Sequence, residues 1–202
     1  MQASHSIYLF LERPLWSAIF AVSYVAFFAV GMWAGRRERG MTRGEDRDQG
    51  SRVVIYILTF AGIALSFAAP RLFPSARIAL PSELVFGVSM TLFWSGVVMY
   101  CWAISTLGVA FRTSVQLLAD QRLITSGPYR ILRHPAYTGG ILILGGIGLA
   151  TGNWLSVTAS TLSVALAYAW RIHVEELALR ERFGEEFKAH QRRTWAVIPF
   201  VW

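Results

Sequence analysis

The sequence predicts an all-α, integral membrane helical bundle of about five transmembrane helices, with a C-terminal helical hairpin and a cytoplasmic helix. Three observations indicate this fold class. Several uncharged apolar runs approach or exceed the roughly 20 residues that a helix needs to cross a bilayer core. Two shorter apolar runs are separated only by the turn at 151–153. Most Lys and Arg residues fall in alternate connecting segments, which is typical of membrane topology.

The first half of the chain holds three predicted spans, at 15–35, 53–69 and 84–107. A backbone in lipid must satisfy its own hydrogen bonds, so these runs are expected to be helices. Pro14 precedes the first span, where a first helical turn tolerates proline. We expect Pro70 to end the second span, because proline interrupts a helix.

The second half begins with a loop of mixed character and continues with two short apolar runs, at 135–150 and 154–170. Because the turn at 151–153 is so short, these runs should form an antiparallel helical hairpin. The segment 171–193 is predicted to be a charged helix, broken or capped near Gly184. The chain then returns to apolar character.

The distribution of Lys and Arg along the chain predicts its orientation in the membrane. Sixteen of the 19 Lys and Arg residues lie in the segments 36–52, 108–133 and 171–193. The positive-inside rule therefore predicts an N-terminus outside, with the C-terminus and the active site facing the cytoplasm. We expect 1–107 to be a transmembrane anchor of three helices and 108–202 to be a cofactor-binding catalytic region. The first apolar run lacks a cleavable signal pattern and is expected to be a permanent anchor. The segment 36–52 is expected to be a solvated connector.

Composition argues against several classes of function. The net charge of +7 is spread over short segments between apolar runs, which disfavours nucleic acid as a partner. The single cysteine, Cys101, excludes a disulfide framework or a cysteine-rich metal site within one chain. His173, Glu175 and His190 match no established metal-ligand spacing, so no metal is expected.

The stretch 127–140 is the most unusual part of the sequence, because it crowds prolines, tyrosines, arginines and a histidine at the edge of an apolar run. His134 precedes Pro135, so its backbone favours an extended conformation and Pro135 is well placed to begin a helix. Free backbone N–H groups at a helix start, together with Arg133, favour an anion there. Alternatively, the arginine extends to lipid headgroups and Tyr137 is an interfacial aromatic.

A glycine-rich segment follows, from Gly139 to Gly152. Small residues inside an apolar helix favour close packing against a neighbouring helix. A ligand bound against the same small-residue face is the alternative, whereas a dinucleotide loop would need a preceding strand.

Two consecutive acids, Glu175 and Glu176, follow the last predicted span. Arg171 and Glu175 are four residues apart, as are Glu176 and Arg180, so a surface helix with ion pairs is one interpretation. Carboxylates beside a membrane span are energetically unfavourable, so their presence suggests a function. These two glutamates lie on the same predicted side of the membrane as the stretch 127–140. A functional site shared by the two segments is the other interpretation.

At this point the sequence resembles the isoprenylcysteine carboxyl methyltransferase family and the related phospholipid N-methyltransferases. The resemblance covers about residues 107 to 202. The matching blocks are Gly127-Pro128-Tyr129-Arg130, Arg133-His134-Pro135-Ala136-Tyr137-Thr138-Gly139, Glu175-Glu176-Leu177, Phe183-Gly184-Glu185-Glu186-Phe187 and Ile198-Pro199-Phe200.

The resemblance implies an integral membrane enzyme that uses S-adenosylmethionine and has no Rossmann domain. The cofactor-binding residues that it implies are Tyr129, Arg133, His134, Pro135, Tyr137, Gly139, Glu175 and Glu176. Carboxylates suit the ammonium or ribose of this cofactor, arginine suits its carboxylate, and tyrosine faces suit its adenine or its cation. Arg171 or Arg193 is expected to anchor an acidic acceptor group, and Glu176 or His190 to act as a base if the acceptor is an amine.

One departure from the family concerns Gln121, where relatives often carry a histidine; glutamine can form hydrogen bonds but cannot titrate. Sterol reductases share part of the Arg133 to Gly139 block, but the pair of glutamates favours a methyltransferase.

The predicted function is methyl transfer to a lipophilic or amphiphilic acceptor, such as a prenylcysteine-type carboxylate. The alternatives are a phospholipid N-methyltransferase, an NADPH-dependent membrane sterol-type reductase and a non-enzymatic membrane protein. A prenylated protein, a phospholipid, a quinone-like lipid and a small thiol all remain open as acceptors, and membrane lipids are expected partners.

Overall fold

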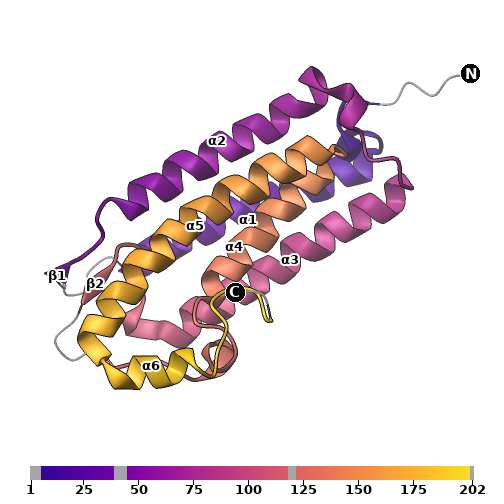
Figure 1. Cartoon of the computed structure of the whole chain (residues 1–202). Coiled ribbons are helices and arrows are strands. Elements are labelled where there is room, and N and C mark those ends of the chain that lie inside the picture. Colours follow the sequence, from indigo (N-terminus) through magenta and orange to yellow (C-terminus); the bar gives the residue numbers. More distant parts are fainter. Residues whose placement is uncertain (1–5, 39–44, 118–121, 201–202) are drawn as a thin grey trace, which may run out of the picture.

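The computed structural model describes residues 6–38, 45–117 and 122–200, and its long helices lie side by side in a bundle (Figure 1). The α-helices are α1 (Pro14–Glu38), α2 (Ser51–Leu72), α3 (Ser82–Leu107), α4 (Pro135–Ala150), α5 (Trp154–Phe183) and α6 (Glu185–Gln191). Short 3-10 helices are η1 (Leu9–Leu11), η2 (Pro74–Ala76), η3 (Gly108–Ala110) and η4 (Gly127–Arg130). The two-residue strands β1 (Glu45–Asp46) and β2 (Gln116–Leu117) pair in antiparallel fashion. The predicted helical class is confirmed.

Three of the described helices are long and apolar enough to cross a membrane, and they match the first three predicted spans. Their spans are Pro14–Arg36, Ser51–Leu72 and Ser82–Leu107, with 23, 22 and 26 residues. Large apolar side chains such as Val22, Val25 and Ile57 are more than half exposed on α1 and α2. Exposed apolar surface of this kind suits contact with lipid rather than water. The protein is therefore an integral membrane protein.

The predicted hairpin is formed by α4 and the first half of α5. Asn153 begins α5, and its side-chain oxygen accepts a hydrogen bond from the backbone N–H of Leu155 at 2.9 Å. The two segments predicted as a span and a charged helix are one continuous helix up to Phe183. Gly184 then ends α5 with φ 52°, a conformation that favours glycine, so the predicted break is confirmed.

The prediction that Pro70 ends the second span is wrong, because α2 continues to Leu72. A proline inside a helix lacks the N–H that would bond the carbonyl four residues earlier, here that of Ser66. The buried hydroxyl of Ser156 on α5 donates a hydrogen bond of 2.6 Å to that carbonyl. The neighbouring helix thus satisfies the group that proline leaves open, and the helix persists.

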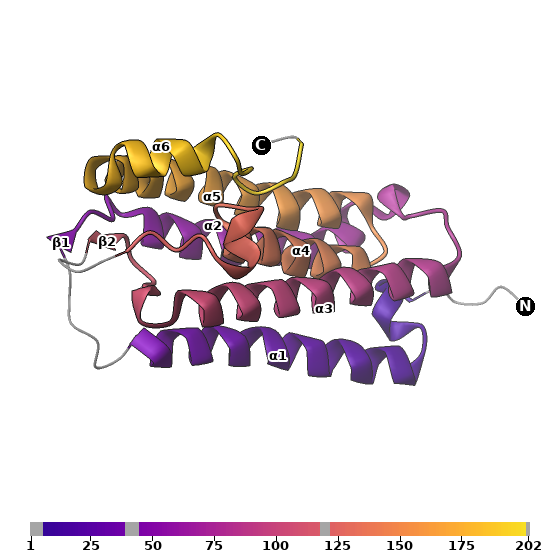
Figure 2. The same ribbon diagram turned by 90° about the horizontal axis from the view of Figure 1, so that it is seen from below.

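Glycines let α4 approach α3 very closely. A Cβ on Gly96 of α3 would lie 2.6 Å from the carbonyl oxygen of Gly139, and a Cβ on Gly139 would lie 2.7 Å from that of Gly96. Gly146 meets the carbonyl of Ser89 in the same way, at 2.7 Å. The close-packing interpretation of these glycines is confirmed. α5 packs along α2, and α1 lies on the outer side of α3 (Figure 2).

The connector before α2 is more than a solvated loop. β1 pairs with β2, and the backbone N–H of Arg47 donates to the carbonyl of Val115 at 2.9 Å. Asp48 is only 8% exposed, so the prediction of a solvated connector is wrong for this residue. The strand pair and α6 lie at the end of the bundle opposite the start of α1 (Figure 2). This end also holds the start of α4 and the charged half of α5.

Candidate active site

The approach to α4 is fixed by the C-terminal segment of the chain. The backbone N–H of Arg133 donates to the carbonyl of Trp195 at 2.7 Å, and that of His134 to the carbonyl of Ala196 at 2.9 Å. The Thr138 hydroxyl donates to the carbonyl of Val197 at 2.7 Å. Pro135 then begins α4, as predicted. The segment 195–197, far away in the sequence, therefore holds the helix start in place.

Glu176 is the anion that lies beside this helix start. Its Oε1 accepts a hydrogen bond from Nε of Arg133 at 2.8 Å and lies 3.3 Å from Nε2 of His134. Its Oε2 accepts a hydrogen bond from the Gln191 amide at 2.7 Å. Burial raises the pKa of this carboxyl, but the bonds from His134 and Arg133 outweigh burial and lower its pKa to about 2. The donors predicted to hold an anion thus hold a carboxylate of the chain itself.

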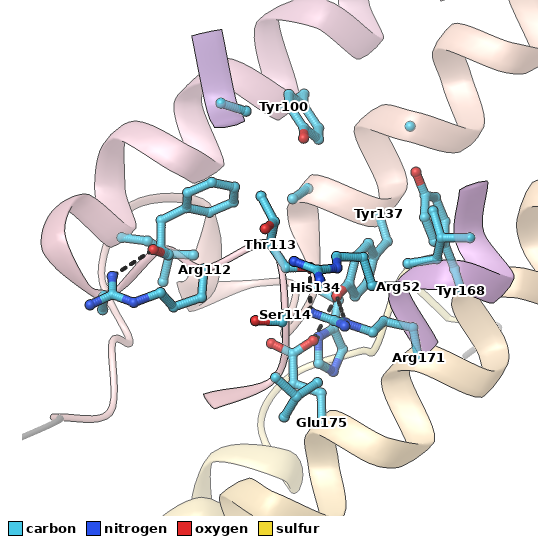
Figure 3. Close-up of a pocket in the computed structure, with 18 of the residues that line it drawn as sticks. Arg52, Tyr100, Arg112, Thr113, Ser114, His134, Tyr137, Tyr168, Arg171 and Glu175 are labelled. Carbon is cyan, nitrogen blue, oxygen red and sulfur yellow. Dashed lines mark hydrogen bonds and ion pairs between the residues drawn. The ribbon is translucent and has the colours of Figure 1, made fainter. Parts of the chain in front are cut away.

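Glu175 points the other way, into a cavity. Its Oε2 accepts a hydrogen bond from the Tyr137 hydroxyl at 2.7 Å and lies 3.7 Å from Nδ1 of His134. Its side chain remains 32% exposed. Within the described residues Oε1 has no hydrogen-bond partner, which leaves that oxygen for a ligand. Figure 3 shows Glu175 beside Tyr137, His134 and Arg171.

Arg171 is 3% exposed, and all its nitrogens have partners. Nε donates to the Tyr137 hydroxyl oxygen at 3.2 Å, and Nη2 donates to the carbonyl of Thr113 at 3.1 Å. Nη1 donates to the Ser51 hydroxyl at 2.8 Å and forms an ion pair with Asp48. Burial lowers the pKa of Arg171, but the neighbouring tyrosine and carboxylates raise it above its ordinary value, so the guanidinium stays charged.

Asp48 is a residue of this site that the sequence did not predict. It lies in a connector among many charges, and no local pattern separates it from its exposed neighbours. Burial raises the pKa of Asp48, whereas backbone N–H groups of Arg52 and Val115 and the charge of Arg171 lower it, with a net lowering. Only the folded arrangement places it against α5.

The cavity has a volume of about 540 Å³, within the range of small-molecule sites. Its apolar wall comes from α1 and α2 and includes Phe27, Ile55 and Phe60. Its polar wall carries the tyrosines and charged groups shown in Figure 3. Among the described lining residues Glu175 is the sole carboxylate, whereas arginine occurs five times. The lining arginines are Arg52, Arg112, Arg122, Arg133 and Arg171.

The structure brings most of the predicted site residues to this cavity. Those that line it are Tyr129, Arg133, His134, Tyr137, Arg171, Glu175 and His190. Pro135, Gly139 and Glu176 do not line it but support residues that do. Arg193 is exposed and lies outside the lining. Gln121 lies outside the described residues.

Further lining residues were not singled out by the sequence. Arg52 on α2 and Tyr100 on α3 come from the part expected to be an anchor. Tyr168 on α5 comes from the predicted catalytic region, and its ring stacks on that of Tyr137 with centroids 4.6 Å apart. Across the described residues, no three His, Cys, Asp or Glu side chains gather in a way that could hold a metal ion. The polar chemistry of the site therefore comes from arginine, tyrosine, histidine and one exposed carboxylate.

Comparison with known proteins gives consistent matches. Residues 84–186 match the sequence pattern of the phospholipid methyltransferase family. A probable protein-S-isoprenylcysteine O-methyltransferase of Oryza sativa subsp. indica is 35% identical over 101 residues, which cover 49% of this chain and 53% of the relative. Protein-S-isoprenylcysteine O-methyltransferase B of Arabidopsis thaliana is 30% identical over 118 residues, covering 57% of this chain and 59% of the relative.

A solved structure is also similar. The eukaryotic intramembrane Ras methyltransferase, an isoprenylcysteine carboxyl methyltransferase, superposes with a TM-score of 0.60 and 27% identity. The match covers 72% of this chain and 52% of that one. The chain thus spans about half the length of the curated relatives and of the solved structure that it matches.

Proposed function

The chain belongs to the phospholipid methyltransferase family, and from this premise we propose that it transfers a methyl group from S-adenosylmethionine to a lipophilic acceptor that carries a carboxylate. The acceptor class is that of a prenylcysteine, which the names of the plant relatives suggest. The observation that carries the proposal is the exposed Glu175 carboxylate in a cavity with one apolar wall and one arginine-rich wall.

The residues present fit the methyl donor. Oε1 of Glu175 suits an ammonium or a ribose hydroxyl. The described contacts of Arg133 use Nε and Nη1, which leaves Nη2 for the donor's carboxylate. The face of Tyr129 suits an adenine or a cation, whereas the ring of Tyr137 is stacked between His134 and Tyr168 and supplies its hydroxyl. When bound, S-adenosylmethionine supplies a methyl group on a positively charged sulfur.

The supporting residues act by holding these groups in place. Glu176 fixes both Arg133 and His134, and with a pKa of about 2 it is a weak base. We therefore assign Glu176 to positioning rather than to proton transfer. Pro135 sets the direction of α4, and Gly139 sets its distance from α3.

The acceptor's carboxylate belongs beside the arginine-rich wall. Of the two arginines predicted to anchor it, Arg171 lines the cavity and attracts the carboxylate through its positive charge, since its nitrogens are already bonded within the chain, whereas Arg193 is exposed and lies outside the lining. A carboxylate is already ionised at neutral pH, so no base is required. The task of the chain is to hold the acceptor oxygen in line with the methyl group and to exclude water. The apolar wall formed by α1 and α2 suits the acceptor's hydrocarbon chain.

An amine acceptor, as in a phospholipid N-methyltransferase, fits less well. The five arginines of the described lining outnumber its one carboxylate, so the cavity as a whole repels an ammonium, and proton removal would fall to His190. Burial and the nearby Arg133 and His134 lower the pKa of His190, so it is neutral at pH 7 and could accept a proton. The charge balance of the lining still favours an anionic acceptor.

We further propose that residues 108–202 supply most of the donor site, whereas 1–107 supply the apolar wall. The cavity end of the bundle faces the cytoplasm and the N-terminus lies outside, as the Lys and Arg distribution indicates.

The test uses the full chain purified in detergent with S-adenosylmethionine carrying a labelled methyl group. Farnesylated N-acetylcysteine, phosphatidylethanolamine and a sterol with NADPH are offered in separate reactions. We expect label on the farnesylated carboxylate, and at least a tenfold loss of donor affinity in Glu175→Gln. Label on phosphatidylethanolamine alone would reassign the acceptor, and NADPH oxidation without methyl transfer would overturn the enzyme class.

A further inference from the structure

We propose that Asp48 is a positioning residue of this site, which holds the Tyr137 hydroxyl and the Glu175 carboxylate in place through Arg171. The inference rests on the proposed function for its role in catalysis. Asp48 lies outside the residues that match the family pattern, in a connector where no sequence pattern singles it out.

The first step is the environment of Asp48 itself. Its Oδ1 accepts a hydrogen bond from the Ser51 hydroxyl at 3.2 Å and from the backbone N–H of Val115 at 3.1 Å. Its Oδ2 accepts one from the backbone N–H of Arg52 at 3.1 Å. One carboxylate therefore joins the start of α2 to the segment before β2, and both segments contribute lining residues to the cavity.

The second step is the ion pair with Arg171. Both partners are almost fully buried, and a buried guanidinium without its carboxylate is strongly unfavourable. Ser51 connects the two, because its hydroxyl accepts from Arg171 at 2.8 Å while it donates to Asp48. Asp48 thus fixes where the Arg171 guanidinium lies.

The third step is the direction of the Tyr137 hydroxyl. Because Nε of Arg171 donates to the hydroxyl oxygen, the hydroxyl hydrogen is directed to the other neighbour, Oε2 of Glu175. This hydrogen bond orients the carboxylate so that Oε1 faces the cavity. The four side chains form one continuous series from the connector to the donor site, and neighbours in such a series are energetically coupled.

The series makes a prediction that a purely structural role does not. In Asp48→Asn the charge partner of Arg171 is lost, so Tyr137 and Glu175 lose their fixed orientation. We expect KM for S-adenosylmethionine to rise about tenfold. KM for the farnesylated acceptor should change less than threefold, because the acceptor is attracted by the charge of Arg171, which Asp48→Asn leaves in place. The effect of Asp48→Asn should largely disappear in a Glu175→Gln background. The matched control is Glu45→Gln, which removes an exposed carboxylate that pairs with Arg47 on the surface.

A second measurement needs no catalysis. Thermal unfolding of Asp48→Asn, Tyr137→Phe and the double variant should be non-additive, because both changes break the same series. If the wild-type chain transfers no methyl group, the proposed function fails, and this unfolding cycle still decides the link between Asp48 and Tyr137. Additive unfolding shifts would overturn the inference.

If methyl transfer is observed, the kinetic outcomes decide the role in the site. An unchanged donor KM in folded Asp48→Asn, or full additivity with Glu175→Gln, would overturn the inference while the proposed function stands. If Asp48→Asn does not fold, Ser51→Ala takes its place, since it weakens the ion pair and keeps both charges. We expect about a threefold rise in donor KM for Ser51→Ala, and no rise would overturn the inference.

Discussion

The pairing of Glu176 with Arg133 and His134 makes the stability of the protein depend on pH in a calculable way. The pKa of the Glu176 carboxyl falls from the ordinary 4.5 to about 2, and the side chain is 13% exposed. This lowering of the pKa on folding corresponds to ~3 kcal/mol of stabilisation by the ionised carboxylate. Because the folded pKa is the lower one, this stabilisation is present above pH 4.5 and is lost as pH falls towards 2.

The variant Glu176→Gln keeps the shape of the side chain but cannot titrate. We expect it to be less stable than wild type by ~3 kcal/mol at pH 7, and we expect this gap to narrow by about 2 kcal/mol at pH 3 as the unfolded wild-type chain takes up a proton. Equilibrium unfolding of both proteins in the same detergent, from pH 7 to pH 3, measures the gap directly. A gap that stays constant across this range would refute the assignment of the shift to Glu176. Glu185→Gln, at an exposed position on α6, is the control.

Three further predictions concern single positions. Ser156→Ala should lower the free energy of unfolding by roughly 1–3 kcal/mol, because it exposes the carbonyl that the proline in α2 leaves open; an effect no larger than that of exposed Thr158→Ala, measured by thermal unfolding, would contradict this. Gly139→Ala should destabilise the bundle by ~1–3 kcal/mol, because the added Cβ would clash with the backbone of α3. In the control Gly87→Ala the added Cβ has nothing within 4 Å, so this variant should be neutral or mildly stabilised, and equal melting temperatures of the two variants would contradict the close packing. Arg193→Ala should change KM for the acceptor by less than threefold; a tenfold rise in a methyl-transfer assay would return it to the site.

Much of the fold follows from local sequence. Uncharged runs locate the spans because lipid leaves a backbone few alternatives to a helix. Asn153 and Gly184 mark a helix start and a helix end through their own side-chain and backbone preferences. The end of α2 could not be predicted from Pro70. Whether a proline ends a helix depends on whether another group bonds to the carbonyl that it leaves open, and here that group is Ser156, which lies far away in the sequence.

The candidate site was likewise only partly predictable from local sequence. The segment around His134 and the two glutamates stand out because such residues are unusual at a membrane edge. Which glutamate faces the ligand could not be read from the sequence, because consecutive residues on a helix differ in direction and the partners come from other elements. Asp48 was missed for the same reason: its role depends on Arg171, a residue brought to it only by the fold.

The continuity of α5 has a consequence for the surrounding lipid. Its 30 residues span about 45 Å, so the half that packs in the bundle and the half that carries Glu175 tilt as one rod. The start of α4 is tied to this rod, because Arg133 pairs with Glu176 and the Tyr137 hydroxyl donates to Glu175. A helix that is long for its bilayer adjusts by tilting. Acyl-chain length should therefore change the depth and tilt of the whole donor site in the bilayer, and leave the distance between Glu175 and α4 unchanged.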